Sequence, residues 1–181
     1  AVLDVADVVD LIGVEEGHEE HAEHAEHADE EREGHEGHDH GDTDPHFWQD
    51  PLRVADLADA VAKELGTIDE DNADTYEKNA TALRTELEEL DASYAAGLAS
   101  CERDTIVASH DAFGYLEKYG LHVESIVGLS PEATPSPAVL GKLQDLIKKE
   151  GITTVFSEPL EPALGDALAS DLKLKNGVLD P

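Results

Sequence analysis

Residues 105–110 read Thr105-Ile106-Val107-Ala108-Ser109-His110, a short β-branched and apolar run that ends at a serine and a histidine. Such a run predicts a strand, which we place at 104–109. Helical and strand-like segments alternate after it: helix 111–119, strand 121–127, helix 136–150, strand 152–157, helix 161–171 and strand 176–179. This alternation predicts an α/β fold with a mostly parallel, doubly wound sheet.

Polar side chains follow three of these predicted strands. His110, Glu158 and Asp180 each come directly after a strand-like run. In open α/β sheets, ligands bind beyond the carboxyl ends of the strands. These three residues are therefore candidates for a binding site.

The N-terminal half is less regular. Residues 1–14 predict a short strand and turn, and residues 15–43 are a low-complexity tract of Glu, His, Ala, Gly and Asp, for which we expect a disordered loop. A helix is expected from Pro51, with Leu52, Leu57, Val61 and Leu65 facing inward, and Gly66 is expected to end it. The apolar pattern over 69–98 predicts a helix about 45 Å long, enough to brace two lobes, with a short coiled coil as the alternative.

The chain is strongly acidic, with 43 acidic residues against 12 basic ones and a formal net charge of −31. Outside residues 15–46 there are still 29 acids and 11 bases, a net charge of −18, so the acidity is distributed. A surface this negative repels nucleic acid and argues against such a partner. It is typical of a halophilic protein, with an ordinary acidic protein as the alternative.

The low-complexity tract is rich in metal-binding side chains. It contains seven histidines: His18, His21, His24, His27, His35, His38 and His40. Imidazole binds zinc, copper and nickel, and the neighbouring carboxylates attract cations generally. The tract is therefore a candidate accessory metal site, with an inert acidic linker as the alternative.

His46 lies in a different setting, between two prolines and beside Phe47 and Trp48. Taken singly, His46 could be a packed residue, His110 a general base and Asp180 a turn former. Together, two imidazoles and a carboxylate supply three of the four donors of a tetrahedral zinc site. We therefore consider His46, His110 and Asp180 as one candidate metal site, with Glu158 as a neighbour that could orient a ligand.

Several segments, in this order and spacing, resemble the metal-specific solute-binding proteins of ABC importers, particularly the zinc branch. They are the His-rich tract, Asp44-Pro45-His46-Phe47-Trp48-Gln49-Asp50-Pro51, the long helix, Ser109-His110-Asp111-Ala112-Phe113-Gly114-Tyr115-Leu116, 135–146, Phe156-Ser157-Glu158-Pro159 and Leu179-Asp180-Pro181. The family's first ligand, a histidine of the early N-lobe, has no counterpart here. We therefore expect a fragment that lacks the N-terminal part and the last C-terminal helix.

The resemblance implies two lobes with parallel sheets, joined by a long rigid helix, with the metal held between them. It divides the chain into an N-lobe remnant at 1–65, which includes the loop at 15–43, a linking helix at 66–100 and a C-terminal α/β lobe at 101–181. It implies that His46 is an N-lobe ligand, His110 a C-lobe ligand, and Asp180 a C-lobe ligand or near neighbour.

The function that the resemblance implies is an extracytoplasmic, non-enzymatic carrier that captures Zn²⁺ and delivers it to an ABC importer permease. It implies a place at the cell surface or in the periplasm, with a membrane anchor in the full-length protein. Three alternatives remain: a manganese- or iron-binding member of the family, a metal-dependent surface adhesin, and a zinc hydrolase with Glu158 as its base. His110 and the His-rich tract favour zinc over manganese, because zinc prefers nitrogen donors more strongly.

Overall fold

The computed structural model of the chain describes residues 2–13, 43–159 and 162–181. Its α-helices are α1 (Pro51–Ile68), α2 (Ala73–Leu98), α3 (Pro137–Glu150) and α4 (Ala163–Leu172), and its strands are β1 (Thr105–Ala108), β2 (His122–Ser125), β3 (Thr154–Ser157) and β4 (Lys175–Val178). Short 3₁₀ helices are η1 (Val5–Asp7), η3 (Phe47–Gln49), η4 (Glu70–Asn72) and η5 (Gly114–Tyr119). In the described part of the chain, no helix is long and apolar enough to cross a membrane.

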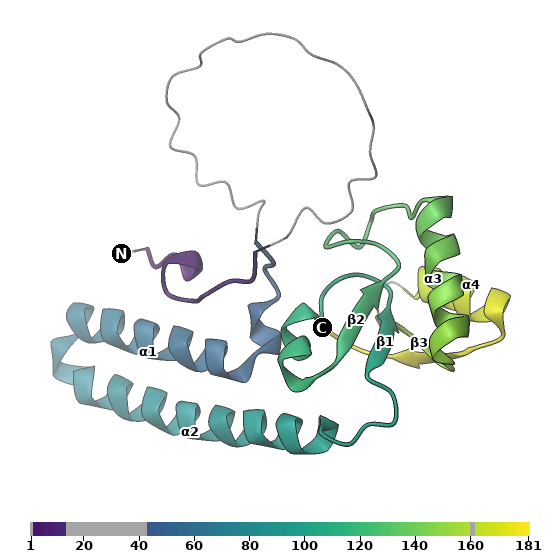
Figure 1. Cartoon of the computed structure of the whole chain (residues 1–181). Coiled ribbons are helices and arrows are strands. Elements are labelled where there is room, and N and C mark those ends of the chain that lie inside the picture. The colour runs from purple at the N-terminus through teal and green to yellow at the C-terminus, as the bar shows by residue number, and fades with distance from the viewer. Residues whose placement is uncertain (1, 14–42, 160–161) are drawn as a thin grey trace, which may run out of the picture.

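The strands form one parallel sheet in the order β2-β1-β3-β4. Helices α3 and α4 connect β2 to β3 and β3 to β4, as parallel pairing requires (Figure 1). The predicted α/β class and parallel sheet are confirmed. The described residues hold a single sheet, so the division into two lobes stays a prediction.

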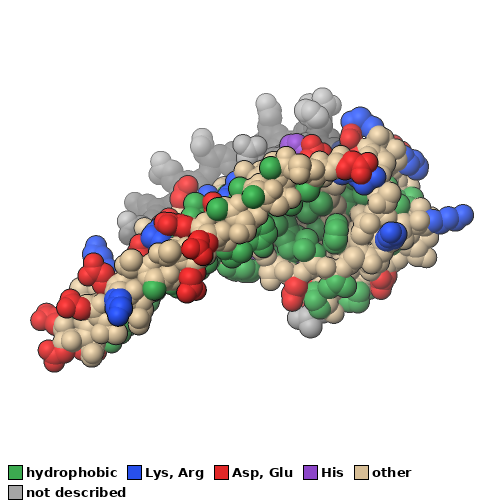
Figure 2. Space-filling view, turned by 90° about the horizontal axis from the view of Figure 1, so that it is seen from below, with side chains coloured by type: hydrophobic (Ala, Val, Ile, Leu, Met, Phe, Trp, Pro, Cys, Tyr) green, Lys and Arg blue, Asp and Glu red, His purple; other side chains and the backbone are tan. Residues whose placement is uncertain are grey.

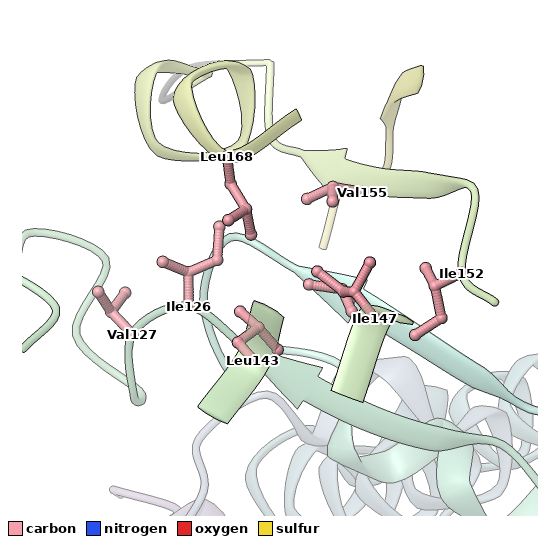
Figure 3. Close-up of a cluster of buried hydrophobic side chains, with 8 residues drawn as sticks. Ile126, Val127, Leu143, Ile147, Ile152, Val155 and Leu168 are labelled. Atoms are coloured by element: carbon pink, nitrogen blue, oxygen red, sulfur yellow. The ribbon is translucent and has the colours of Figure 1, made fainter. Parts of the chain in front are cut away.

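Two apolar clusters cover opposite faces of the sheet, because successive strand residues point in opposite directions. Val107 belongs to the cluster that packs against α3 and α4, whose buried members are Val107, Ile126, Val127, Leu143, Ile147, Ile152, Val155 and Leu168 (Figure 3). Ala108 faces the other way and packs with Ala112, Phe113, Leu116 and Leu121. Leu98, at the end of α2, packs on this second cluster and so brings α2 to the sheet.

Helices α1 and α2 pack side by side as an antiparallel hairpin (Figure 1). The side chain of Asp50 caps α1 by accepting from the Leu52 N–H, and Pro51 occupies the first helical position. The long helix predicted over 69–98 is confirmed as η4 followed by α2. Contrary to expectation, α1 passes through Gly66 to Ile68; a Cβ at Gly66 would lie 3.3 Å from the Cβ of Ala73, so the glycine permits a close approach of the two helices.

Three further expectations are corrected. The N-terminal strand is absent from residues 2–13, where the chain instead forms η1 and pairs once, through Gly13 and Thr43. Thr43 is thus part of a β-bridge rather than of a disordered loop, while residues 14–42, with their seven histidines, lie outside the described residues. The helix predicted at 111–119 is only the 3₁₀ helix η5, because the Asp111 N–H donates to the carbonyl of Gly128 and holds the chain in a turn.

Candidate metal centre

His46 lies just before η3, and a nearby carboxylate fixes its position. Oδ1 of Asp44 accepts a hydrogen bond from the His46 backbone N–H at 2.9 Å and lies 2.7 Å from the ring nitrogen Nδ1. Both residues are buried. Ring and backbone of His46 are therefore held by the same side chain.

His110 lies just beyond the carboxyl end of β1, and a carboxylate also contacts its ring. Its Nδ1 contacts the carboxylate of Glu158, which follows the neighbouring strand β3, and Glu158 also accepts from the Ser109 hydroxyl at 2.7 Å. His110 is only 4% exposed. Parallel pairing of β1 with β3 brings these residues together although 48 positions separate them.

The two imidazoles face each other. Their Nε2 atoms are 3.4 Å apart, and their ring planes meet at 63°. The roles of the ring nitrogens depend on the tautomer: where each Nδ1–H donates to its carboxylate oxygen, the Nε2 atom of each ring carries the lone pair. Two lone pairs that face each other at this distance form a site for a shared cation.

The separation agrees with zinc coordination. Two nitrogens at about 2.0–2.1 Å from one ion, at a tetrahedral angle, lie about 3.3–3.4 Å apart. Zinc-binding histidines commonly donate their other ring N–H to a carboxylate, which fixes tautomer and orientation. Asp44 and Glu158 stand in that relation to His46 and His110.

The surroundings of the two rings are acidic. Burial raises the pKa of Asp111, and the carboxylates of Asp44 and Glu117 add to this rise, while His46 and His110 oppose it. Burial is the largest cause of this rise, so only the smaller contribution of the two neighbouring carboxylates reports a negative potential near the rings. Such a potential attracts a cation to the imidazole pair.

The remaining predicted ligand stands apart. Asp180 is exposed, and the described part of the chain contains no group of three or more His, Cys, Asp or Glu side chains arranged to hold a metal. Asp44 was not predicted as part of the site, although its place two residues before His46 is a local signal that could have indicated it. His122, the third histidine of the described residues, is exposed on β2.

Comparison with known proteins agrees with this geometry. The family model of ZnuA, described as the periplasmic component A of the zinc-uptake complex, matches residues 1–181. The chain belongs to the ZnuA family.

Individual relatives have names that refer to zinc binding or zinc uptake. The chain is 38% identical over 144 residues to the zinc-binding lipoprotein AdcA of Streptococcus pneumoniae strain R6, covering 78% of this chain and 29% of AdcA. It is 40% identical over 143 residues to the high-affinity zinc uptake system protein ZnuA of Brucella abortus strain 2308, covering 78% of this chain and 43% of that protein. The chain thus spans less than half the length of either relative.

A solved structure shares the fold. The laminin-binding protein Lmb of Streptococcus agalactiae, described as a bifunctional protein with adhesin and metal-transporting activity, superposes with a TM-score of 0.73 at 36% identity. The match covers 77% of this chain and 55% of Lmb.

Proposed function

We propose that this chain is part of an extracytoplasmic zinc-binding protein that captures Zn²⁺ and delivers it to an ABC importer permease. The observation that carries this proposal is the 3.4 Å separation of two buried imidazole nitrogens whose rings are each held by a carboxylate. Membership in the ZnuA family supports the transport role. The lipoprotein relative supports a membrane-anchored place outside the cytoplasm, at the cell surface or in the periplasm.

In this proposal His46 and His110 bind the ion, and Asp180 supplies a carboxylate. Asp44 and Glu158 orient the two imidazoles. The histidines of the tract at 15–43 act as accessory capture sites. Two nitrogen donors favour Zn²⁺ over Mn²⁺, which prefers oxygen ligands, so manganese should bind more weakly.

A non-enzymatic role is part of the proposal. A zinc hydrolase needs a general base free to reach a metal-bound water. The carboxylate of Glu158, the candidate base, is engaged by His110 and by the Ser109 hydroxyl. That arrangement favours holding a ligand over accepting a proton from water.

Adhesion is a second candidate function, favoured by the likeness to Lmb. Binding of this chain to immobilised laminin, measured with and without zinc, tests it separately from metal capture.

The test of zinc binding can use Trp48, the only tryptophan, whose ring centroid lies 5.3 Å from that of His46. Its fluorescence reports events at this site in the whole chain, and titration against a chelator of known affinity gives the Kd for zinc. His110→Ala should weaken zinc binding at least tenfold, about 1.4 kcal/mol. His122→Ala is the matched control, because this exposed histidine should leave the Kd unchanged.

The same titration examines the proposed carboxylate ligand. Asp180→Asn keeps the shape of the side chain and removes its charge, so it should also weaken zinc binding. An unchanged Kd would remove Asp180 from the site, and equal affinities for His110→Ala and His122→Ala would overturn the imidazole pair.

A further inference from the structure

We propose that Tyr115 is a positioning residue for the metal centre, because its hydroxyl fixes the segment that carries His46 relative to the segment that carries His110. This inference rests on the proposed zinc site. Tyr115 belongs to η5, five residues after His110, and is 2% exposed.

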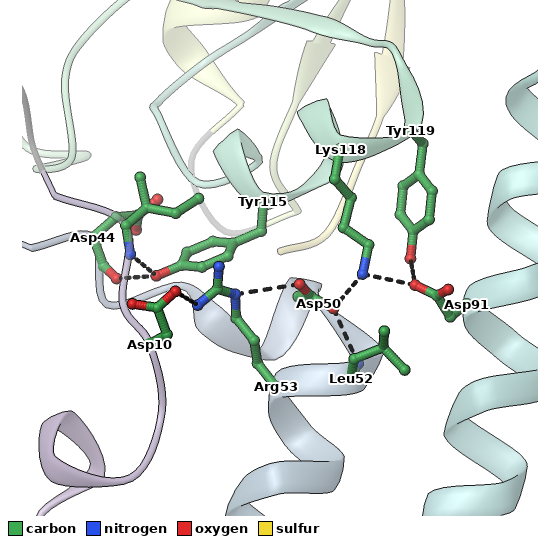
Figure 4. Close-up of polar contacts among 10 residues, drawn as sticks. Asp10, Asp44, Asp50, Leu52, Arg53, Asp91, Tyr115, Lys118 and Tyr119 are labelled. Carbon is green, nitrogen blue, oxygen red and sulfur yellow. Dashed lines mark hydrogen bonds and ion pairs between the residues drawn. The ribbon is translucent and has the colours of Figure 1, made fainter.

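The hydroxyl of Tyr115 makes two hydrogen bonds across the molecule (Figure 4). It donates to the backbone carbonyl of Asp44 at 2.7 Å and accepts from the backbone N–H of Ile12 at 3.0 Å. The Asp44 N–H in turn donates to the carbonyl of Ile12 at 2.8 Å. One buried hydroxyl thus joins the chain around Asp44, the chain around Ile12 and η5.

The position of Asp44 bears directly on His46. The Asp44 carboxylate holds both the backbone N–H and the ring Nδ1 of His46. A shift of the Asp44 backbone therefore moves the imidazole. Since Tyr115 follows His110 in the same chain segment, its bond to Asp44 links the two rings by a route that does not involve the metal.

The other end of the His46 segment is held by the same 3₁₀ helix. Residues three apart in a 3₁₀ helix share a face, which places Lys118 beside Tyr115. Lys118 Nζ lies 2.5 Å from Oδ1 of Asp50 (Figure 4). Asp44 and Asp50, which flank His46 in the chain, are thus both held by η5.

The first experiment compares two tyrosines of η5. Tyr115→Phe keeps the buried ring and deletes the bonds to Asp44 and Ile12. Tyr119→Phe deletes one bond of the same 2.7 Å length, to Asp91, and removes no direct hydrogen bond to the His46 segment. Both variants should lose some stability without metal, but only Tyr115→Phe should alter the zinc site.

We expect Tyr115→Phe to weaken zinc binding by about five- to tenfold, at the lower edge of what residues around metal ligands contribute, because it acts one bond further away. Zinc release into excess chelator, followed by Trp48 fluorescence, should accelerate by a similar factor, whereas Tyr119→Phe should stay within about twofold of the wild type. A structural role alone would lower the melting temperature of both variants and leave the zinc affinity of the folded protein unchanged. Equal zinc affinities for the two variants would overturn the inference.

A second measurement needs no variant. Coupling is reciprocal, so hydrogen bonds that favour zinc binding must themselves be stabilised when zinc binds. Exchange of the Ile12 amide hydrogen should therefore slow when zinc chloride is added to the wild-type chain. The amide of Val123, which donates to the side chain of Glu117 instead, serves as the control. Equal changes at the two amides would contradict the positioning role.

The two proposals fail in different ways. A wild-type chain whose Trp48 fluorescence does not respond to zinc would overturn the zinc site itself. A normal wild-type response with an unaffected Tyr115→Phe variant would overturn only the role of Tyr115.

Discussion

The α/β part and the α1–α2 hairpin bury their apolar side chains to different extents. Each buried member of the cluster between the sheet and helices α3 and α4 is at most 6% exposed. In the hairpin the buried residues are small, Pro51, Ala55 and Ala80. Six of its larger apolar side chains are 38–66% exposed, namely Val61, Leu65, Ile68, Leu83, Leu90 and Tyr94, while others, such as Leu57 and Leu87, are partly buried.

The same contrast is visible on the surface. Figure 2 shows hydrophobic side chains gathered in a hollow between the hairpin and the rest of the molecule, while acidic side chains crowd one end of the hairpin. Burial stabilises the sheet, since apolar area removed from water contributes roughly 25 cal/mol per Å². The hairpin depends more on close helix packing through small residues and on ion pairs. The same substitution should therefore reduce the free energy of unfolding by different amounts in the two regions.

The largest expected difference is between two leucines. Leu143→Ala removes a side chain that is 4% exposed in α3 and should reduce the free energy of unfolding by about 2–5 kcal/mol. Leu90→Ala makes the same deletion in α2, where the side chain is 46% exposed, and should cost less than about 1 kcal/mol. Urea unfolding at several protein concentrations measures both. Similar costs would mean that the hairpin face is buried in solution, and a concentration dependence would assign that burial to self-association.

A smaller effect is expected where the two regions meet. Lys118 on η5 pairs with Asp50, at the start of α1, and with Asp91 of α2 at 2.6 Å (Figure 4). The side chain of Lys118 is 30% exposed, so Lys118→Met should cost about 1–2 kcal/mol, between the values for exposed and buried pairs. Lys118→Arg keeps the charge and should recover part of this loss.

The pH dependence of this effect has a defined sign. Hydrogen bonds from Lys118 and Tyr119 lower the pKa of Asp91. Burial opposes the charge on Lys118, but the carboxylates of Asp50 and Asp91 outweigh it and raise the pKa of that lysine. The stabilisation is therefore present between the ordinary values of about 3.9 and 10.4, and is lost as the pH falls through the lowered pKa of Asp91 or rises through the raised pKa of Lys118. The stability gap between wild type and Lys118→Met should stay constant from about pH 6 to 8 and shrink below about pH 4; a gap that widened in acid would rule out this pairing as its origin.

The sheet was largely predictable from the sequence because its signals are local. β-branched runs indicated the strands, and Pro137 and Gly151 mark the ends of α3, the glycine in a left-handed conformation at the C-cap. The hairpin was harder to predict. Leu52, Leu57, Val61 and Leu65 have helical spacing, yet Val61 and Leu65 are about 40% exposed, since a periodic pattern identifies a face without showing what covers it.

The candidate site also combines residues that could be predicted from local sequence signals with contacts that could not. His110 and Glu158 were singled out because they follow strand-like runs, and His46 because it lies between two prolines beside two aromatic residues; both are local signals. The contact of Tyr115 with Asp44 joins residues 71 positions apart, and the helical pattern around it suggested an α-helix instead of η5. Interactions of that kind depend on how the turn after β1 folds against the sheet, so the pattern could not reveal them.

The smallest expected effect concerns the ion pairs that join α1 to α2. Arg84 of α2 lies 2.7 Å from the carboxylates of Asp56 and Asp59 of α1, and these pairs are largely exposed. Arg84→Gln should therefore reduce the free energy of unfolding by less than about 1 kcal/mol in dilute buffer. Lys149→Gln is the matched control, because it removes one positive charge but only a local pair with Glu150. The difference between the two variants in free energy of unfolding therefore measures the ion pairs between α1 and α2, separately from the change in net charge.

Salt separates the bridge further from the overall charge. In about 1 M KCl the Debye length falls to about 3 Å, so the difference between Arg84→Gln and Lys149→Gln should largely disappear. The same salt screens the repulsion of a chain with a formal net charge of −31, so the wild type and both variants should become more stable. Urea unfolding at low and molar KCl measures both changes. A wild-type stability that does not change with KCl would argue for an ordinary acidic protein, and a difference that survives molar salt would show that Arg84 acts through packing between the helices rather than through its charge.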